Sequence, residues 1–458
     1  DSGRVCYTTQ RICRTLWIES SLMPNRNEQN TTNYIHPEES NIYDVHKAMT
    51  YDPYGQPVLR IDDTTKQHTS KNRVKISGHD ITDFSTYTFS KNVLNWDERI
   101  IGTGSVVHVP EYGMVKFEVG GTAGDEVIRQ TKRVQRYIPG RSAEVAMTVI
   151  FGAPTTGIRK RIGLFDNTDG AYFEDGGDGT YYVATRRKDG ASFIDTRVAR
   201  DNWNYDKLDG TGPSGITADP TALQHIVIEY EWYGAGQVEF KYVIGNNSFP
   251  IHRFDHANRQ SYPWASTASL PVRCELTNVA GTAGTHEFYQ GSHSFATEGA
   301  TELLGRQNNI TTAITGKTLA TANTFYPMVA IRLKTTALNS VVLPDAFSAA
   351  TLDNSSVFVR VLEGAIVTGG TWVSYSDDSP IEYNITATDY TGGIALETIY
   401  VSASGQGSVF RFNERAITQI DRTTTTTLGD TSDTFVVAMA STVANKDGFA
   451  SLGWVEVR

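Results

Sequence analysis

One segment constrains the fold more than any other, because it alternates polar and apolar residues on both sides of a glycine-rich turn. Residues 222–245 read ALQHIVIEYEWYGAGQVEFKYVIG. Alternate positions of an extended chain fall on the same face. The apolar positions of the two halves are Ile226, Ile228, Tyr230 and Trp232, then Val238, Phe240, Tyr242 and Ile244. The pattern predicts a β-hairpin with one buried face.

Similar strand-like segments recur between residues 101 and 300, with turn residues between them. They occupy residues 143–152, 161–166, 171–190 and 270–278. The segment 171–190 is itself a hairpin pattern with a Gly-Asp-Gly turn. No helical pattern separates these segments, which favours a β-sandwich. We expect a jelly roll of the concanavalin (lectin) type over residues 101–300.

A second region of strand-like segments follows, richer in threonine, alanine and serine. Its segments are residues 329–335, 356–364, 381–389, 396–403, 408–412, 433–441 and 451–458. Glycine pairs and single glycines fall between several of them, as turns require. The pattern predicts a C-terminal, threonine-rich β domain over residues 301–458, and the fold class is therefore all-β.

Residues 1–100 differ, because they are polar, weakly periodic and interrupted by four prolines. Such a segment cannot close a core of its own, so it is either disordered or laid across another surface. Its large aromatic residues favour the second interpretation. We therefore predict an extended N-terminal arm that docks on other subunits through Trp17, Tyr43, Tyr51, Tyr54 and Trp96.

The composition excludes several classes of function. Among 458 residues, 51 Asp and Glu outnumber 41 Lys and Arg, giving a net charge of -10 that disfavours nucleic acid as a partner. No run of 18 apolar residues occurs, so no membrane insertion is expected. The first 20 residues lack the apolar core of a secretory signal. The 3 cysteines are too few for a disulfide framework and lack zinc-site spacing, so we expect reduced thiols.

Candidate catalytic and metal-binding groups are sparse. Glu229 and Glu231 fall on one face of the predicted strand, about 6.6 Å apart by strand rise, as a glycan depolymerase could use them. The Glu-x-Asp-x-x-Glu pattern of glucanases with this fold is absent, however. His252 and His256 lie at a strand end rather than on a helix, which argues against a metal pair.

Acidic turns at residues 166–170, 174–179 and 205–215 could bind Ca²⁺, yet Asp and Gly are also ordinary turn residues. No nucleophile-elbow, phosphate-loop or dinucleotide motif occurs. We therefore predict no catalytic residues, no metal, no cofactor and a protein that is not an enzyme.

Five aromatic residues are candidates for stacking on sugar rings, because they fall in predicted loops or at strand ends. They are Trp203, Tyr205, Tyr233, Tyr262 and Trp264. Core or interface packing is the competing interpretation for each of them.

Residues 133–278 resemble a sandwich module of structural proteins from tailed bacteriophages, of the marine and cyanophage type. The resemblance rests on the stretches RVQRYIPGRSAEVAMTVIFG, RIGLFDNTDGAYFE, DKLDGTGPSG and the strand pair joined by YGAG. It covers about a third of the chain and implies a concanavalin-like (LamG-type) jelly roll carried on a virion protein.

These observations predict a virion structural protein of a tail, fibre, baseplate or capsid-attached position, assembled in the host cytoplasm. Its expected partners are itself, as a homo-oligomer such as a trimer, and other virion proteins. The alternatives are a receptor-recognition protein that binds a host surface glycan, a glycan depolymerase that uses Glu229 and Glu231, and a bacterial cell-surface β protein.

Overall fold

The computed structural model describes most of the chain. The described residues are 47–51, 57–61, 79–245, 247–299, 305–351, 355–402, 408–412 and 419–457. The chain divides into two compact units, residues 1–68 and 69–458. In the first unit, β1 (Lys47–Tyr51) pairs antiparallel with β2 (Pro57–Ile61).

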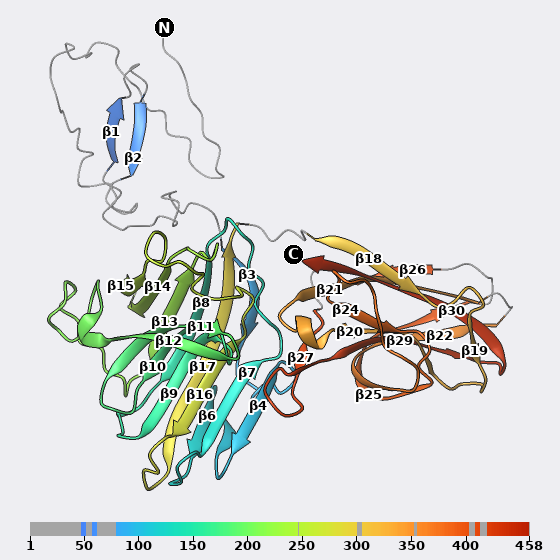
Figure 1. The fold of residues 1–458 in the computed structure, drawn as a ribbon, viewed down its shortest axis with the longest axis horizontal. Helices are drawn as coiled ribbons and strands as arrows, with labels where there is room; N and C mark the ends of the chain where they lie inside the picture. Colours follow the sequence, from blue (N-terminus) through green and yellow to red (C-terminus); the bar gives the residue numbers. More distant parts are fainter. Residues whose placement is uncertain are drawn as a thin grey trace, which may run out of the picture. The chain divides into compact units, whose positions relative to one another are not determined.

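The second unit begins with a sandwich of two antiparallel sheets (Figure 1). One sheet has seven strands in the order β12-β11-β10-β9-β16-β7-β4. Their bounds are β4 (Trp96–Ile101), β7 (Glu126–Thr131), β9 (Ile158–Phe165), β10 (Gly170–Asp175), β11 (Tyr181–Asp189), β12 (Ser192–Ala199) and β16 (Val272–Asn278). A short 3-10 turn, η3 (Arg200–Asn202), follows β12 directly.

The other sheet of this first sandwich has eight strands. Seven run in the order β15-β14-β13-β8-β17-β6-β5, and β3 also pairs with β17. Their bounds are β3 (His79–Ser85), β5 (Ser105–Val109), β6 (Met114–Val119), β8 (Ala143–Ile150), β13 (Gln224–Tyr230), β14 (Val238–Ile244), β15 (Asn247–Phe254) and β17 (His286–Glu298).

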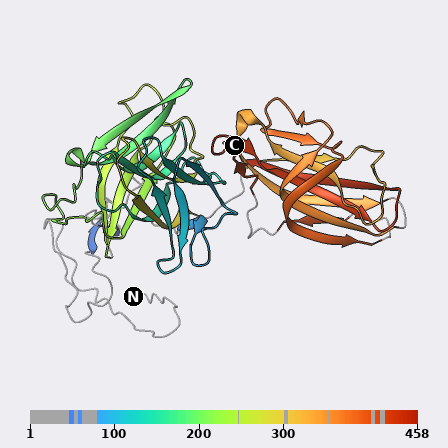
Figure 2. The ribbon, with the colours of Figure 1, turned by 90° about the horizontal axis from the view of Figure 1, so that it is seen from below.

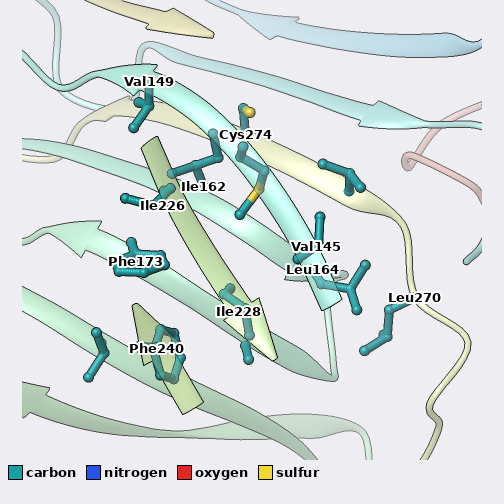
Figure 3. Close-up of a cluster of buried hydrophobic side chains, with 14 of the residues drawn as sticks. Val145, Val149, Ile162, Leu164, Phe173, Ile226, Ile228, Phe240, Leu270 and Cys274 are labelled. Carbon is teal, nitrogen blue, oxygen red and sulfur yellow. The ribbon is translucent and has the colours of Figure 1, made fainter. Parts of the chain in front are cut away.

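Side-chain alternation explains how the two sheets meet. In β8, Val145, Met147 and Val149 are buried while the residues between them are half-buried, as a period of two requires. Figure 3 shows apolar side chains from both sheets converging between the layers. The labelled members are Val145, Val149, Ile162, Leu164, Phe173, Ile226, Ile228, Phe240, Leu270 and Cys274.

A second sandwich follows in the same unit (Figures 1 and 2, orange and red). One sheet has the order β18-β30-β21-β26, with β19 also paired to β30, and the other has the order β23-β24-β20-β29-β22-β25. The first sheet comprises β18 (Arg306–Thr311), β19 (Lys317–Leu319), β21 (Val341–Thr351), β26 (Ser408–Arg411) and β30 (Lys446–Val457). The second comprises β20 (Tyr326–Leu333), β22 (Val357–Thr368), β23 (Val373–Ser374), β24 (Ile381–Asn384), β25 (Asp389–Val401) and β29 (Thr434–Ser441).

Three short elements complete the described chain, namely η4 (Thr335–Ala337) and the small pair β27 (Arg422–Thr423) and β28 (Thr431–Ser432). The second sandwich has its own core, in which Trp454 and Phe347 are fully or almost fully buried. Within the described residues, no helix is long and apolar enough to cross a membrane.

The predicted fold class, an all-β chain with a concanavalin-like jelly-roll sandwich and a further β domain, is confirmed. The hairpin predicted at residues 222–245 forms as β13 and β14, with Ile226, Ile228 and Phe240 fully buried. The sheets of the first sandwich also include β3 and β4, which except for Ile101 lie inside the segment 1–100 that the sequence assigns to an arm. Trp96 of β4 is 2% exposed in this core.

Candidate functional site

A pocket in the first sandwich has three aromatic residues among the eight that line it. The space around these side chains measures about 270 Å³ when the open solvent at the mouth is included, and the enclosed part has room for about one water molecule. Its lining residues are Tyr181, Arg200, Trp203, Leu208, Ala218, Pro220, Gln224 and Tyr242. We call this the aromatic pocket. The enclosed part is small, so a ligand larger than water would lie mostly in the mouth.

Local hydrogen bonds shape the wall of the pocket between η3 and β13. The Trp203 amide donates to the Arg200 carbonyl at 3.1 Å, and the indole Nε1 donates to the Val198 carbonyl at 3.2 Å. The Asp206 carboxylate accepts the backbone N–H groups of Leu208 and Ser214, both at 2.8 Å. These four hydrogen bonds hold an irregular loop that contains no regular element after η3.

Tyrosine hydroxyl groups supply the polar chemistry of the pocket. Within the described part of the chain, the buried Tyr181 hydroxyl has no hydrogen-bond partner. Burial raises its pKa, and burial likewise raises the pKa of Tyr242 to about 12. Both phenols are therefore neutral at physiological pH, and the Tyr181 O–H is a buried donor in the pocket wall whose oxygen has almost no exposed surface.

A row of three polar side chains leads from the pocket into the sandwich. Strand register places Asp175 of β10 between Lys160 of β9 and Tyr181 of β11. The Lys160 Nζ lies 3.3 Å from Asp175 Oδ2, and the two side chains are 3% and 0% exposed. Burial lowers the pKa of Lys160 and raises the pKa of Asp175. The charge of each residue partly offsets the effect of burial on the pKa of the other.

The structure separates the five residues predicted to stack on sugars. Trp203 lies in the wall of the aromatic pocket, and Tyr205 follows it in the same loop. Trp264 is 3% exposed and stacks on the His256 ring inside the core. Tyr233 and Tyr262 are about half exposed outside the pocket, where the Arg187 guanidinium covers the Tyr262 ring at 3.9 Å. Glycan binding by these five residues stays a prediction.

The glutamates considered for hydrolysis occupy different surroundings. Glu229 accepts a hydrogen bond from Ser142 at 2.7 Å and pairs with Lys241. Its direct neighbours across the sheet are Glu144 and Glu239, so the strands bring together three glutamates that the sequence did not link. Glu231 lies beyond the end of β13 and is 2% exposed. The structure thus places Glu144, rather than Glu231, beside Glu229 in a shallow pocket.

The outer face of the seven-stranded sheet carries a feature that sequence reasoning missed. Arg161 contacts Glu174 at 2.5 Å and Glu275 at 3.4 Å, from the two strands flanking its own. Arg186 pairs with Asp195 at 2.8 Å, and Arg273 pairs with Glu275 at 2.7 Å. Burial acts to raise the pKa of Glu275, but Arg273, Arg161 and two further arginines outweigh it and lower the pKa to about 2. The arginines and the carboxylates of this network lie on neighbouring strands that are mostly distant in sequence, so only the fold reveals their pairing.

The acidic turns use their carboxylates for turn geometry. Asp166 accepts the N–H groups of Thr168 and Asp169, at 2.8 and 2.9 Å. Asp178 accepts the Thr180 N–H at 3.0 Å in the same manner. Across the described ranges, no three His, Cys, Asp or Glu side chains gather in a way that could hold a metal ion.

The histidines near residue 254 sit in apolar surroundings. Burial lowers the pKa of His252 to about 4, and its neutral Nδ1 accepts the Asn204 N–H at 3.2 Å. The pKa of His256 is also lowered, first by burial, and its Nδ1 bonds the Gly236 carbonyl at 2.7 Å.

The predicted assembly residues of the arm fall mostly outside the described part of the chain. Trp17, Tyr43 and Tyr54 lie there, and Tyr51 belongs to β1. Trp96 packs in the first sandwich, where its Nε1 donates to the Ser85 hydroxyl at 3.1 Å.

No family model and no curated protein matches this sequence. Several solved structures resemble the chain over about half its length. One is a glycoside hydrolase family 16 endo-glucanase from Bacteroides ovatus, with 9% identity over 47% of this chain and 100% of that chain and a TM-score of 0.32. A legume lectin-like domain from Entamoeba histolytica has 12% identity over 44% and 90%, with a TM-score of 0.27. The CBM2 module of the evolved Dit of Lactobacillus casei BL23 phage J-1 has 10% identity over 49% and 99%, with a TM-score of 0.33.

These comparisons correct one prediction from the sequence. The prediction that the protein is not an enzyme is wrong as stated, because structures similar to this one include glycoside hydrolases such as the endo-glucanase. The absence of a sequence motif excludes only those reactions whose catalytic residues lie close together in the sequence. An identity of 9% describes a likeness of fold and assigns no reaction to this chain.

Proposed function

We propose that this protein is a subunit of a tailed-phage particle whose first sandwich binds saccharides through the aromatic pocket. The observation that carries the binding role is the pocket itself, where aromatic rings, an arginine and a buried tyrosine hydroxyl converge. The resemblance of residues 133–278 to phage structural proteins supports the location in a virion.

The chemistry of the pocket suits a sugar ring. Saccharides offer apolar C–H faces, which pack on aromatic rings, and hydroxyl groups that need defined donors and acceptors. Trp203 and Tyr242 form the buried wall, and Tyr181 adds a ring that is partly exposed. A sugar hydroxyl that reaches below the mouth would satisfy the Tyr181 O–H, which has no partner among the described residues. This group is costly to leave buried and unpaired.

Removal of that hydroxyl tests the binding role with little change in packing. Tyr181→Phe should weaken binding of the full-length chain to host-surface oligosaccharide by about tenfold, since one hydrogen bond to a buried group is lost. Tyr112→Phe, at a ring that is 66% exposed and outside the pocket, is the matched control and should bind as the unaltered protein does. Absence of binding at millimolar oligosaccharide, measured by calorimetry, would remove the proposed binding role.

A different observation favours the assembly role. Strand β25 is an edge strand of the second sandwich, paired on one side with β22, and most of its residues are exposed. Its exposed apolar side chains include Ile394 at 48%, Leu396 at 38% and Tyr400 at 57%. A long apolar edge is a template for pairing with another chain, and proteins usually protect such edges. We propose that β25 faces a second copy of this chain in the assembled particle.

The oligomeric mass of the full-length chain tests this assembly surface. We expect a defined homo-oligomer, for which a trimer is our prediction, and we expect Leu396→Lys to dissociate it. Ile314→Lys is the matched control, because Ile314 is 98% exposed outside β25. A monomer before any substitution would refute self-assembly of the isolated chain, and equal masses for all three proteins would refute the role of β25.

A further inference from the structure

Arg200 is the one cation that lines the aromatic pocket. It is the first residue of η3, and its side chain is half-buried. Its Nε donates to the Lys207 carbonyl at 2.6 Å, and its Nη2 donates to the Leu208 carbonyl. Two nitrogens of the guanidinium are thus fixed by the loop, which leaves the N–H groups of Nη1 for another acceptor.

The buried arginines of the same sandwich provide a contrast. Arg161, Arg186 and Arg273 each lie within 4.0 Å of at least one carboxylate. The half-buried Arg200 has no such ion pair with any residue in the described ranges. The structure therefore holds a positioned, half-buried cation at a small open pocket, without an ion-paired carboxylate.

Asp175 lies beside Tyr181 and pairs with Lys160, and two further acidic residues near the pocket are also engaged elsewhere. Asp209 is exposed and accepts the Thr211 N–H and hydroxyl at 2.8 and 2.6 Å; these bonds, and to a smaller degree Arg200, lower its pKa. Asp219 at the rim is also exposed and accepts the Thr221 N–H and hydroxyl at 2.9 and 2.7 Å. Neither carboxylate neutralises Arg200 by direct contact.

We propose that the aromatic pocket selects an acidic sugar residue, one that carries a carboxylate or a sulfate ester, over a neutral sugar. The anionic group accepts from Arg200 Nη1 and from the Tyr181 hydroxyl, and the sugar ring packs against the aromatic wall. Charge-assisted hydrogen bonds from arginine to an anionic oxygen are stronger than hydrogen bonds between neutral groups. This inference rests on the proposed saccharide-binding function and names its ligand class.

Matched oligosaccharides separate the inference from the function on which it rests. We would titrate the full-length chain with oligogalacturonate and with the same oligomer as its methyl ester, and with a sulfated galactan oligomer and its desulfated form. We expect at least one acidic oligomer to bind about tenfold more tightly than its neutral counterpart. Whichever acidic oligomer is preferred identifies the anionic group.

The variants assign the preference to Arg200. Arg200→Gln should weaken binding of the acidic oligomer about tenfold more than binding of the neutral oligomer, so that the preference is lost. Arg259→Gln removes an exposed arginine elsewhere and should leave the preference intact. Because Arg200 also holds two loop carbonyls, Arg200→Lys and Tyr181→Phe are second probes, with thermal unfolding of every variant as the check on folding. Tyr181→Phe should reduce acidic binding more than neutral binding.

Each outcome has one meaning. Equal binding of acidic and neutral oligomers to the unaltered protein would overturn the inference and leave saccharide binding in place. A preference that persists in folded Arg200→Gln would also overturn it. Binding of none of the four oligomers would count against the proposed function itself, and a preference lost in Arg200→Gln but kept in Arg259→Gln would support both.

Discussion

The buried ion pair between Lys160 and Asp175 gives the sharpest test of the structure. Its atoms lie 3.3 Å apart inside the first sandwich, and both side chains are almost fully buried. Lys160 also donates to the Ala153 carbonyl at 3.3 Å, and Asp175 also accepts the Gly177 N–H at 3.2 Å. Removing one partner leaves a buried charge with little compensation, which typically costs about 3–5 kcal/mol.

The structure limits this cost, because the remaining partner can become neutral instead. At pH 7, releasing the proton of a lysine with an ordinary pKa costs about 4.6 kcal/mol, and protonating an ordinary aspartate costs about 4.2 kcal/mol. Asp175→Asn and Lys160→Met should therefore each destabilise the protein by about 3–5 kcal/mol. The double variant carries neither charge and keeps the Gly177 contact, so it should lose only about 1–2 kcal/mol.

The two single variants should depend on pH in opposite directions. In Asp175→Asn, burial keeps the pKa of Lys160 below its unfolded value, so the unfolded chain binds more protons and the stability deficit should shrink as pH rises from 7 to 10. In Lys160→Met, burial keeps the pKa of Asp175 raised, so the folded protein binds more protons and the deficit should shrink as pH falls from 7 to 4.

Scanning calorimetry of the full-length chain measures both effects. For a domain of this size, a loss of 3–5 kcal/mol lowers the unfolding temperature of the first sandwich by roughly 6–20 °C. A single variant that costs less than about 1 kcal/mol, or a double variant whose cost equals the sum of the two single costs, would refute a coupled buried pair. Equal pH dependence in both single variants would refute the assigned charges.

Three further predictions concern other buried groups. Trp96→Ala should destabilise the first sandwich by about 3–5 kcal/mol in denaturant unfolding, and an unchanged midpoint would contradict the core position of Trp96. Burial raises the pKa of the Cys274 thiol, so a thiol reagent at pH 8 should label Cys274 only after the protein unfolds. Mass spectrometry of the peptide that contains Cys274 measures this labelling, and rapid labelling of the native protein would contradict the prediction. Glu275→Gln should lower the free energy of unfolding by about 2–3 kcal/mol at pH 7, because the lowered pKa of Glu275 stabilises the folded state. This stabilisation is complete above about pH 4.5 and is lost as the pH falls through about 2. The stability of the Glu275→Gln variant should therefore converge with that of the unaltered protein near pH 2, and a constant difference in acid unfolding would argue against the arginine contacts of Glu275.

The strands of this protein could be predicted because their physical cause is local. Alternation in residues 222–245 requires only that one face of an extended chain avoid water, and β13 and β14 form there as expected. The same rule located β8, β16 and most strands of the second sandwich. Glycine turns could be recognised for the same reason, since backbone geometry at a turn depends on a few adjacent residues.

The tertiary structure decided which polar residues meet, because neighbours across a sheet are far apart in sequence. Arg161 meets Glu275 across 114 positions of the chain, and Glu229 lies beside Glu144. Trp96 belongs to a sandwich core although the neighbouring sequence suggests an arm. The residues that bury it come from strands distant in sequence, so the local pattern could not predict its burial. In the aromatic pocket, Trp203 could be proposed from sequence alone. Its association with Tyr181, Tyr242 and Arg200 follows only from the pairing of strands and the path of the loop between them.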